Sequence, residues 1–169
     1  MKILINREQL LEALSNLQRA VTPRSSLPIL EGVLLSAETD RLTMMAYNME
    51  ISIKKELPIR CEREGDIVIS AKILFDIIRK VNGDLIEIEV DDRQVCHIRS
   101  GGSSFDIMGM KSEDFPEMPN VAEKSNITIS SDLLKDMVRQ TIFAISLKEE
   151  TRPILTGISF EIENNEIKL

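Results

Sequence analysis

The residue types that most often carry catalysis are few and scattered in this chain. His97 is the single histidine, and it alternates with its neighbours as in a strand, so neither a catalytic triad nor a metal cluster can be assembled around it. The glycine-rich stretch 100–104 lacks the lysine of a phosphate-binding loop and indicates a hairpin turn. Asp91 and Asp92 also indicate a turn rather than a metal pair. We therefore expect no catalytic residues, no metal and no cofactor.

Positive charge is concentrated in two short stretches, although the chain as a whole is acidic. The net charge is −7 over 169 residues, which argues against a broad basic face that clings to DNA. Residues 7–24 carry three arginines against two glutamates, and residues 70–82 carry three basic residues against one aspartate. The basic residues concerned are Arg7, Arg19, Arg24, Lys72, Arg79 and Lys80. The first two helices are thus expected to be locally basic.

An internal repeat predicts the elements that position these charges. The runs 3–6, 67–70 and 127–130 each combine a short β-like stretch with a polar residue at an N-cap position, and each precedes apolar residues at helical spacing. The motif Pro-Ile-Leu-x-Gly begins at Pro28 and again at Pro153, an offset of 125, while the strand ends before the helices are offset by 124. Two independent landmarks give nearly one period, which predicts a repeat protein.

Each repeat is itself expected to contain two half-units. The strand ends at Ile5 and Ile69 lie 64 positions apart, and alternating apolar runs between the helices indicate strands. Each half-unit is therefore expected to be β-α-β-β-β. Two half-units make an α+β domain with helices on one face of antiparallel sheets. The strands predicted between the helices are 33–37, 42–47, 50–57, 86–90, 95–98 and 105–108.

Prolines and a polar stretch up to residue 125 indicate a linker after the first repeat. We expect a first domain at 1–122 and an incomplete second domain at 123–169, so that the chain is a fragment of a longer protein. The incomplete part should leave strand edges and apolar side chains such as Ile158 and Phe160 uncovered. It should therefore be disordered, or order only by pairing with a neighbour.

Features that would direct the chain to a membrane or to secretion are not apparent. The N-terminal residues lack the apolar core and the cleavage site of a signal peptide, and no apolar run reaches membrane-spanning length. Cys61 and Cys96 stand far apart, without the spacing of a redox or zinc motif. These observations predict a reduced, cytoplasmic protein with structural thiols.

Several segments, in the right order, resemble the bacterial DNA sliding clamp, the beta subunit of DNA polymerase III. They are 27–30 after an arginine-bearing loop, 70–79, 113–116, and 152–157. The resemblance covers the whole chain, as an N-terminal domain plus the start of the middle domain. It implies the DNA-clamp fold: two full-length subunits join head to tail as a homodimer ring, helices line a hole around duplex DNA, and sheets form the outer wall.

The function implied by the resemblance is that of a processivity factor in DNA replication. Such a ring tethers the replicative polymerase of the DNA polymerase III holoenzyme and is not itself a catalyst, although a holoenzyme subunit can carry the label DNA-directed DNA polymerase, a nucleotidyltransferase or transferase. Basic helices facing the phosphate backbone give weak, sequence-independent attraction, which sliding requires. The implied partners are duplex DNA, a second subunit, and the polymerase and clamp loader, which bind through short peptides; no membrane is implied.

The resemblance also implies a DNA-facing role for six basic residues. These are Arg24, Lys72, Arg79, Lys135, Arg139 and Lys148. From the sequence alone, solvated loop and helix residues are the simpler interpretation. On the third helix, Asp132 and Asp136 offset the charge of the two basic residues, so their role is the most open.

Two further sets of residues match family positions at protein interfaces. Arg152 and Leu155 match positions beside the groove that receives apolar peptides, and the rest of that groove would come from later segments. Ile77, Phe105 and Ile107 match the first domain's half of the subunit joint, on the second helix and the last strand. Burial in the core is the alternative for these apolar residues, most strongly for Ile77.

Two other classes of function remain open at the level of sequence. A nucleotidyl-transferring enzyme would need clustered carboxylates that hold metal ions, whereas the acidic residues here are scattered among turns. A generic protein-interaction module would bind its partner tightly through an exposed sheet edge.

Overall fold

A computed structural model of the chain describes residues 1–22, 25–117, 127–147, 151–163 and 166–169. The chain forms two compact units, and each is considered by itself: unit 1 is Met1–Asn120 and unit 2 is Val121–Leu169. The boundary expected between residues 122 and 123 falls in the stretch 118–126, outside the described residues.

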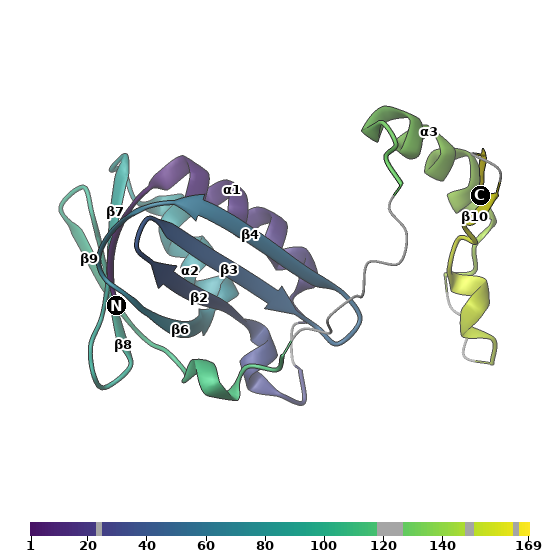
Figure 1. Cartoon of the computed structure of the whole chain (residues 1–169). Coiled ribbons are helices and arrows are strands. Elements are labelled where there is room, and N and C mark those ends of the chain that lie inside the picture. Colours follow the sequence, from purple (N-terminus) through teal and green to yellow (C-terminus); the bar gives the residue numbers. More distant parts are fainter. Residues whose placement is uncertain (23–24, 118–126, 148–150, 164–165) are drawn as a thin grey trace. The chain divides into compact units, whose positions relative to one another are not determined.

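Unit 1 contains two half-units in succession (Figure 1). The first consists of β1 (Lys2–Asn6), α1 (Arg7–Leu17), β2 (Gly32–Glu38), β3 (Arg41–Tyr47) and β4 (Ser52–Pro58), with 3-10 turns at Gln18–Ala20 and Pro28–Glu31. The short strand β5 (Arg60–Arg63) leads to the second, which consists of β6 (Gly65–Ser70), α2 (Ala71–Lys80), β7 (Leu85–Val90), β8 (Val95–Ser100) and β9 (Ser103–Met108). A 3-10 turn, Ser112–Asp114, follows.

The start of each helix follows from its sequence, with one difference between the two half-units. Asn6 Oδ1 accepts a hydrogen bond from the backbone N–H of Gln9 at 3.1 Å, which satisfies one of the free donors at the start of α1. Ser70 occupies the same position before α2, but its side chain makes no capping hydrogen bond. The expected cap is therefore present in the first half-unit only, and α2 depends on its strongly amphipathic sequence and its packing.

The two half-units exchange their first strands. One sheet has the order β5-β1-β7-β8-β9 and the other β4-β3-β2-β6, and all neighbouring strands are antiparallel. Within these sheets β1 pairs with β7 of the second half-unit, with Ile5 opposite Ile86, and β6 pairs with β2 of the first, with Ile69 opposite Val33. Ile5 and Ile69 thus occupy equivalent places, which confirms the predicted α+β fold of two β-α-β-β-β halves. The strand β5 was not predicted.

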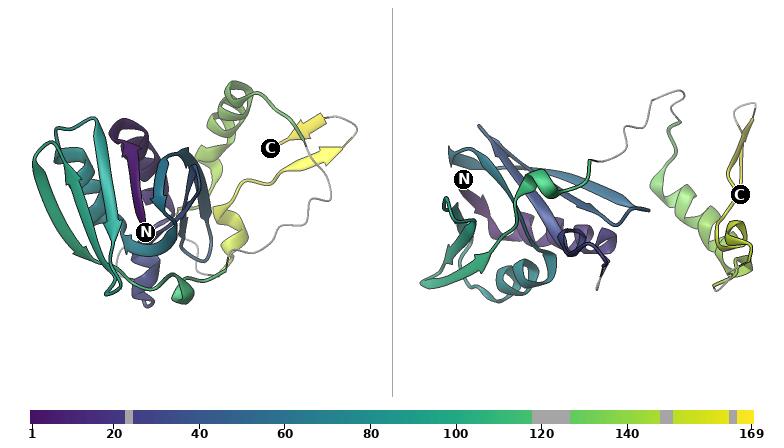
Figure 2. Two further views of the ribbon diagram at one scale, coloured as in Figure 1. Left: turned by 60° about the vertical axis from the view of Figure 1, so that its left-hand side comes forward. Right: turned by 90° about the horizontal axis from the view of Figure 1, so that it is seen from below.

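One apolar core joins both half-units. In the right-hand view of Figure 2, α1 and α2 both lie below the four-stranded sheet, where α1 packs against β3 and β4 and α2 against β2 and β6. Leu10, Leu14, Leu74 and Ile78 from the helices are fully buried against isoleucines, leucines and valines of both sheets. Burying each such side chain contributes on the order of 1.5–3 kcal/mol, so the shared core couples the halves into one cooperative unit.

The outer faces of the two sheets carry charged side chains or are covered by another segment of unit 1. On the five-stranded sheet, Arg99 bridges Glu87 and Glu89 at 2.6 and 3.3 Å. On the four-stranded sheet, Val68 faces outward, but Phe115 packs over it after the turn that follows β9. The segment around Phe115 thus closes unit 1 by covering an apolar spot on the outer face.

Unit 2 contains a single set of elements. After Ser130, whose Oγ accepts the backbone N–H of Leu133 at 3.3 Å, α3 spans Ser131–Thr141. Two 3-10 turns, Ile142–Ala144 and Pro153–Thr156, and the hairpin β10 (Glu161–Glu163) with β11 (Glu166–Lys168) complete its described part. None of the described residues in unit 2 is buried, so its apolar side chains have no core of their own.

Candidate nucleic-acid interface

The helices α1 and α2 lie beside one another in unit 1 (Figure 2). Their charged residues, among them Glu8, Lys72 and Arg79, are exposed. Between them lies a shallow groove with a volume of about 500 Å³. Its lining includes Arg7 and Leu11 from α1 and Phe75 and Arg79 from α2. The two helices therefore share one groove, to whose lining Arg7 and Arg79 both contribute.

Arg79 is held in place by its neighbours on α2. Its Nη2 donates to Asp76 Oδ1 at 3.0 Å, and its guanidinium carbon lies 5.6 Å from the centre of the Phe75 ring, within range of a cation–π interaction. Lys72 stands two turns earlier on the helix, about 10 Å away at 1.5 Å per residue, and is exposed. This spacing allows the two cations to contact separate phosphates of a nucleic-acid backbone.

The charge of this surface is unevenly divided between the two helices. Within its bounds α1 carries Arg7 against Glu8 and Glu12, so the helix itself is not basic; Arg19 lies in the following 3-10 turn. The helix α2 carries three cations against Asp76. The expectation of two basic helices is therefore wrong for α1 and confirmed for α2, because the window of residues 7–24 extended beyond the end of the helix.

The remaining predicted DNA-facing residues lie in unit 2 or outside the described residues. Arg24 and Lys148 lie outside the described residues. On α3 of unit 2, Lys135 approaches Asp132 at 3.9 Å and Arg139 approaches Asp136 at 3.3 Å, and both basic side chains are exposed. These i,i+3 pairs match the charge cancellation expected from the sequence.

The residues predicted for the subunit joint differ in their accessibility. Ile77 and Phe105 are half-buried and pack against the core, while Ile107 is only 7% exposed and belongs to the core. The side chain of Ile107 is thus taken up by unit 1, and a partner could reach only its backbone, since β9 is an edge strand of the five-stranded sheet. Ile73 on α2 and Met108 on β9 are more exposed apolar side chains that the sequence reasoning did not single out.

Arg152 precedes the 3-10 turn Pro153–Thr156 of unit 2, and Leu155 lies within that turn. The backbone N–H of Leu155 donates to Arg152 O at 3.0 Å, and Leu155 O accepts from Ser146 N at 2.9 Å. The side chain of Leu155 is 48% exposed, which leaves it accessible within the described part of unit 2.

The single histidine lies on the outer face of the five-stranded sheet and is part of a polar cluster. His97 Nδ1 lies 2.6 Å from Asp106 Oδ1, and its Nε2 lies 4.0 Å from Asp91. The Asp91 carboxylate accepts the backbone N–H groups of Val95 and Arg93, and these hydrogen bonds, that from Val95 above all, hold the pKa of Asp91 below its ordinary value. Asp91 therefore organises the turn between β7 and β8, as predicted.

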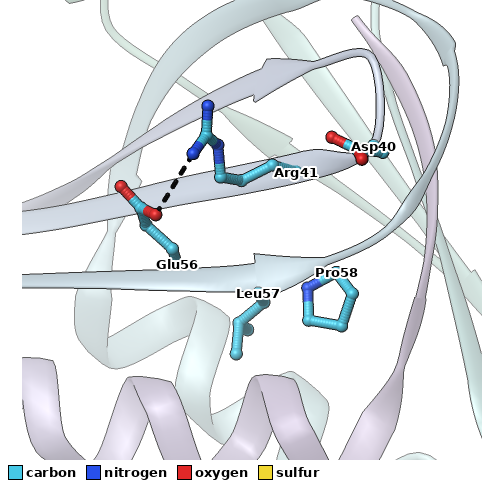
Figure 3. A pocket seen from close by; sticks show the side chains of 5 residues that line it. All are labelled: Asp40, Arg41, Glu56, Leu57 and Pro58. Carbon is cyan, nitrogen blue, oxygen red and sulfur yellow. Dashed lines mark hydrogen bonds and ion pairs between the residues drawn. The ribbon is translucent and has the colours of Figure 1, made fainter.

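A polar hollow at the edge of the four-stranded sheet offers no catalytic arrangement (Figure 3). It has a volume of about 350 Å³ and lies where β3 and β4 begin and end, with Arg41 Nη1 3.4 Å from Glu56 Oε2. Asp40, Leu57 and Pro58 complete its lining. Across the described residues, no three His, Cys, Asp or Glu side chains are grouped to hold a metal ion, and no helix is long and apolar enough to cross a membrane.

Two half-units that exchange strands, with their helices gathered on one side, define a domain of the DNA-clamp class. Solved clamp structures share this fold: the sliding clamp of Bacillus subtilis has a TM-score of 0.94 at 34% identity, over 99% of this chain and 46% of that one. A putative DNA polymerase III beta subunit from Eubacterium rectale has a TM-score of 0.93 at 32% identity, over 99% of this chain and 46% of that one.

The chain belongs to the DNA polymerase III beta subunit family, whose N-terminal domain model matches residues 1–119. Among curated relatives, the beta sliding clamp of Bacillus subtilis (strain 168) is 34% identical over 99% of this chain and 46% of its own length. That of Halalkalibacterium halodurans is 35% identical over 97% of this chain and 45% of its own length. The chain thus spans about half the length of the curated relatives it matches.

Proposed function

We propose that this chain is part of a DNA sliding clamp, a processivity factor that encircles duplex DNA and tethers a replicative polymerase. Membership of the clamp family and the joint surface of α1 and α2 support the proposal. The role is one of binding rather than catalysis, and we place it in the cytoplasm. The observation that carries the proposal is the pair of exposed cations, Lys72 and Arg79, on the polar side of α2.

The proposed contact with DNA is weak and independent of sequence. Lys72 and Arg79 would meet phosphates, while Asp76 between them limits the attraction through its ion pair with Arg79. Phosphate contacts position a protein on the duplex without sequence information, and base edges must be reached to read a sequence. A surface of two adjacent helices with a small net charge is suited to sliding, because tight binding at any one position would stop it.

We also propose the wider set of contacts that the clamp role requires. Arg24, Lys135, Arg139 and Lys148 would contribute to DNA contact, while Ile77 and Phe105 with the edge of β9 would contribute to a head-to-tail joint with a second subunit. Arg152 and Leu155 would border a groove for short peptides of the polymerase and the clamp loader. A relative from Bartonella birtlesii was solved bound to griselimycin, with a TM-score of 0.90 at 32% identity over 97% of this chain and 44% of that one.

Fluorescence anisotropy with a labelled duplex, over a range of salt concentrations, tests the proposed DNA contact. Each phosphate neutralised by a cation contributes about 0.9 to the slope of log K against log salt. Lys72→Ala should lower that slope by about 0.9, equally for duplexes of unrelated sequence. The matched control is Arg60→Ala, which removes an exposed cation from β5 at the edge of the other sheet.

The outcomes separate the proposed surface from general charge attraction. The proposal expects Arg60→Ala to leave the slope unchanged while Lys72→Ala lowers it. Equal losses from both variants would mean that total charge, and not the α1–α2 surface, governs binding. A strong preference for one duplex sequence would contradict a sliding role.

A further inference from the structure

One aromatic side chain, Phe75, lies at the groove between α1 and α2 and is anchored in the core of unit 1. It is half-buried and packs against the apolar core cluster, which fixes the place of its ring. The ring also contributes to the lining of the groove, together with Arg79. A group that rests on the ring therefore takes a defined position at the groove.

Arg79 rests on this ring because of the geometry of α2. Residues four apart on an α-helix are neighbours, and long side chains on a helix point back toward its N-terminus. The side chain of Arg79 therefore extends toward Phe75 and Asp76, one turn earlier. Its guanidinium carbon lies 5.6 Å from the centre of the ring, and its Nη2 lies 3.0 Å from Asp76 Oδ1. The ring supports the guanidinium while the carboxylate holds one of its nitrogens.

This support leaves most of the guanidinium available to a ligand. Arginine has several N–H donors, which can bind the oxygens of a phosphate two at a time. Among the described residues, Asp76 accepts from one of these donors, and 56% of the Arg79 side chain is exposed. Lys72 differs, because its ammonium group has no ring contact and no ion pair among the described residues. The surface thus has one cation held in place and one on an unsupported side chain.

The three α-helices differ in the residues at the positions that support Arg79. Counted from the N-cap residue, the positions of Phe75, Asp76 and Arg79 correspond to Leu11, Glu12 and Ser15 in α1 and to Lys135, Asp136 and Arg139 in α3. The helix α3 keeps the ion pair, at 3.3 Å, without the aromatic residue, and α1 has neither the ring nor the arginine. Helices of this repeat therefore form without the combination that α2 carries, so the fold does not require it.

We propose that Phe75 is a positioning residue that, with Asp76, holds the Arg79 guanidinium where it meets a phosphate of the duplex backbone. The inference rests on the DNA contact proposed above, and it assigns part of the affinity to a residue without charge. Because the rotamers of Arg79 are already restricted in the free protein, less conformational entropy is lost on binding. Phe75 acts through Arg79 and does not itself need to contact the DNA.

NMR relaxation of the arginine Nε–H groups tests the positioning in the absence of DNA. In the 169-residue chain, the order parameter of Arg79 should exceed that of the exposed Arg60 on β5. Phe75→Leu should lower the Arg79 value toward that of Arg60, whereas Phe75→Tyr, which keeps a ring, should preserve it. Leucine is the residue that α1 carries at the equivalent position. An Arg79 that is as mobile as Arg60, or that does not respond to Phe75→Leu, would overturn the proposal.

A double-mutant cycle in duplex binding, measured by anisotropy at low salt, tests the consequence for affinity. Phe75→Leu should weaken binding by about two- to tenfold, which corresponds to immobilising one long side chain on binding. The slope of log K against log salt should stay unchanged, because no cation is removed. In a chain that already carries Arg79→Gln, Phe75→Leu should have no further effect. No loss in the unaltered background, or an equal loss in both backgrounds, would contradict a role that acts through Arg79.

Leu11→Ala is the matched control, since it shortens an apolar side chain of the same groove on the other helix. It should change neither the order parameter of Arg79 nor the affinity for DNA. A loss of affinity equal to that of Phe75→Leu would assign the effect to the apolar lining of the groove and overturn the proposal.

Failure of the DNA contact itself would have a different signature. The slope would then respond neither to Lys72→Ala nor to Arg79→Gln, and the proposed function would fall together with this inference. A slope that responds to both variants, with no coupling between Phe75 and Arg79, would overturn this inference alone.

Discussion

The same leucine at three equivalent positions of the repeat provides a quantitative test of the architecture. Leu10 and Leu74 are fully buried in the one core of unit 1, whereas Leu134 of unit 2 is only half-buried. Replacing a buried leucine with alanine costs about 2–5 kcal/mol, through lost transfer energy and the cavity left behind. We expect about 3 kcal/mol for each of Leu10→Ala and Leu74→Ala, because both sites are enclosed by two sheets and two helices.

Urea unfolding measures the effect. With an m-value of about 2 kcal/mol per molar urea, both unit 1 variants should lower the midpoint by about 1.5 M, in a single shared transition. Leu134→Ala should leave that transition within about 0.5 kcal/mol of the unaltered chain. The reasoning is refuted if Leu134→Ala costs as much as the other two, or if the two half-units of unit 1 unfold in separate steps.

Three further outcomes follow from single sites. Gly32→Ala should destabilise unit 1 by about 1–3 kcal/mol in urea, because a Cβ there would lie 2.5 Å from a valine methyl, whereas Gly157→Ala at the equivalent position, with 3.9 Å of clearance, should be neutral. Asn6→Ala should cost about 0.5–2 kcal/mol by removing the cap of α1, and Ser70→Ala, which removes no cap bond, should cost less than about 0.5; equal costs would contradict the difference in capping. Burial raises the pKa of the Cys96 thiol from 9.0 to about 12, so the unfolded chain loses that proton at a lower pH than the folded chain does. The free energy of unfolding should therefore fall as pH rises through this window. Cys96→Ala should flatten the decrease of the urea midpoint at alkaline pH, and an unchanged decrease would argue against the buried thiol as its cause.

Periodicity and capping residues were sufficient to predict the half-units, because each depends on local sequence. Ile5 and Ile69 are the next-to-last residues of equivalent strands that precede equivalent helices, as the offset of 64 residues predicted. Periodicity does not indicate which strands pair with each other. A run of alternating apolar residues indicates that one face of a strand is buried, but not that β1 joins the sheet of the other half-unit.

The strand β5 and the burial of Ile107 were not predicted from the sequence. The strand β5 has only Cys61 as an inward apolar residue, and the rest of Arg60–Arg63 is charged, so alternation over four residues could not be recognised. Ile107 was assigned to a subunit joint by resemblance, although alternation along β9 places its side chain in the core and that of Met108 outside. The alternation of side chains along β9 would have been enough to predict that Ile107 faces the core.

The central claim is that the joint surface of α1 and α2 meets duplex DNA. Amide chemical shifts of the isotope-labelled chain, followed by NMR during titration with a short duplex at low salt, test it most directly. Shift changes are expected along the polar sides of both helices, around Arg7, Lys72 and Arg79, with none on the outer sheet around Glu87 and His97. Changes centred on the outer sheet, or none in the helices at saturating DNA, would contradict the account.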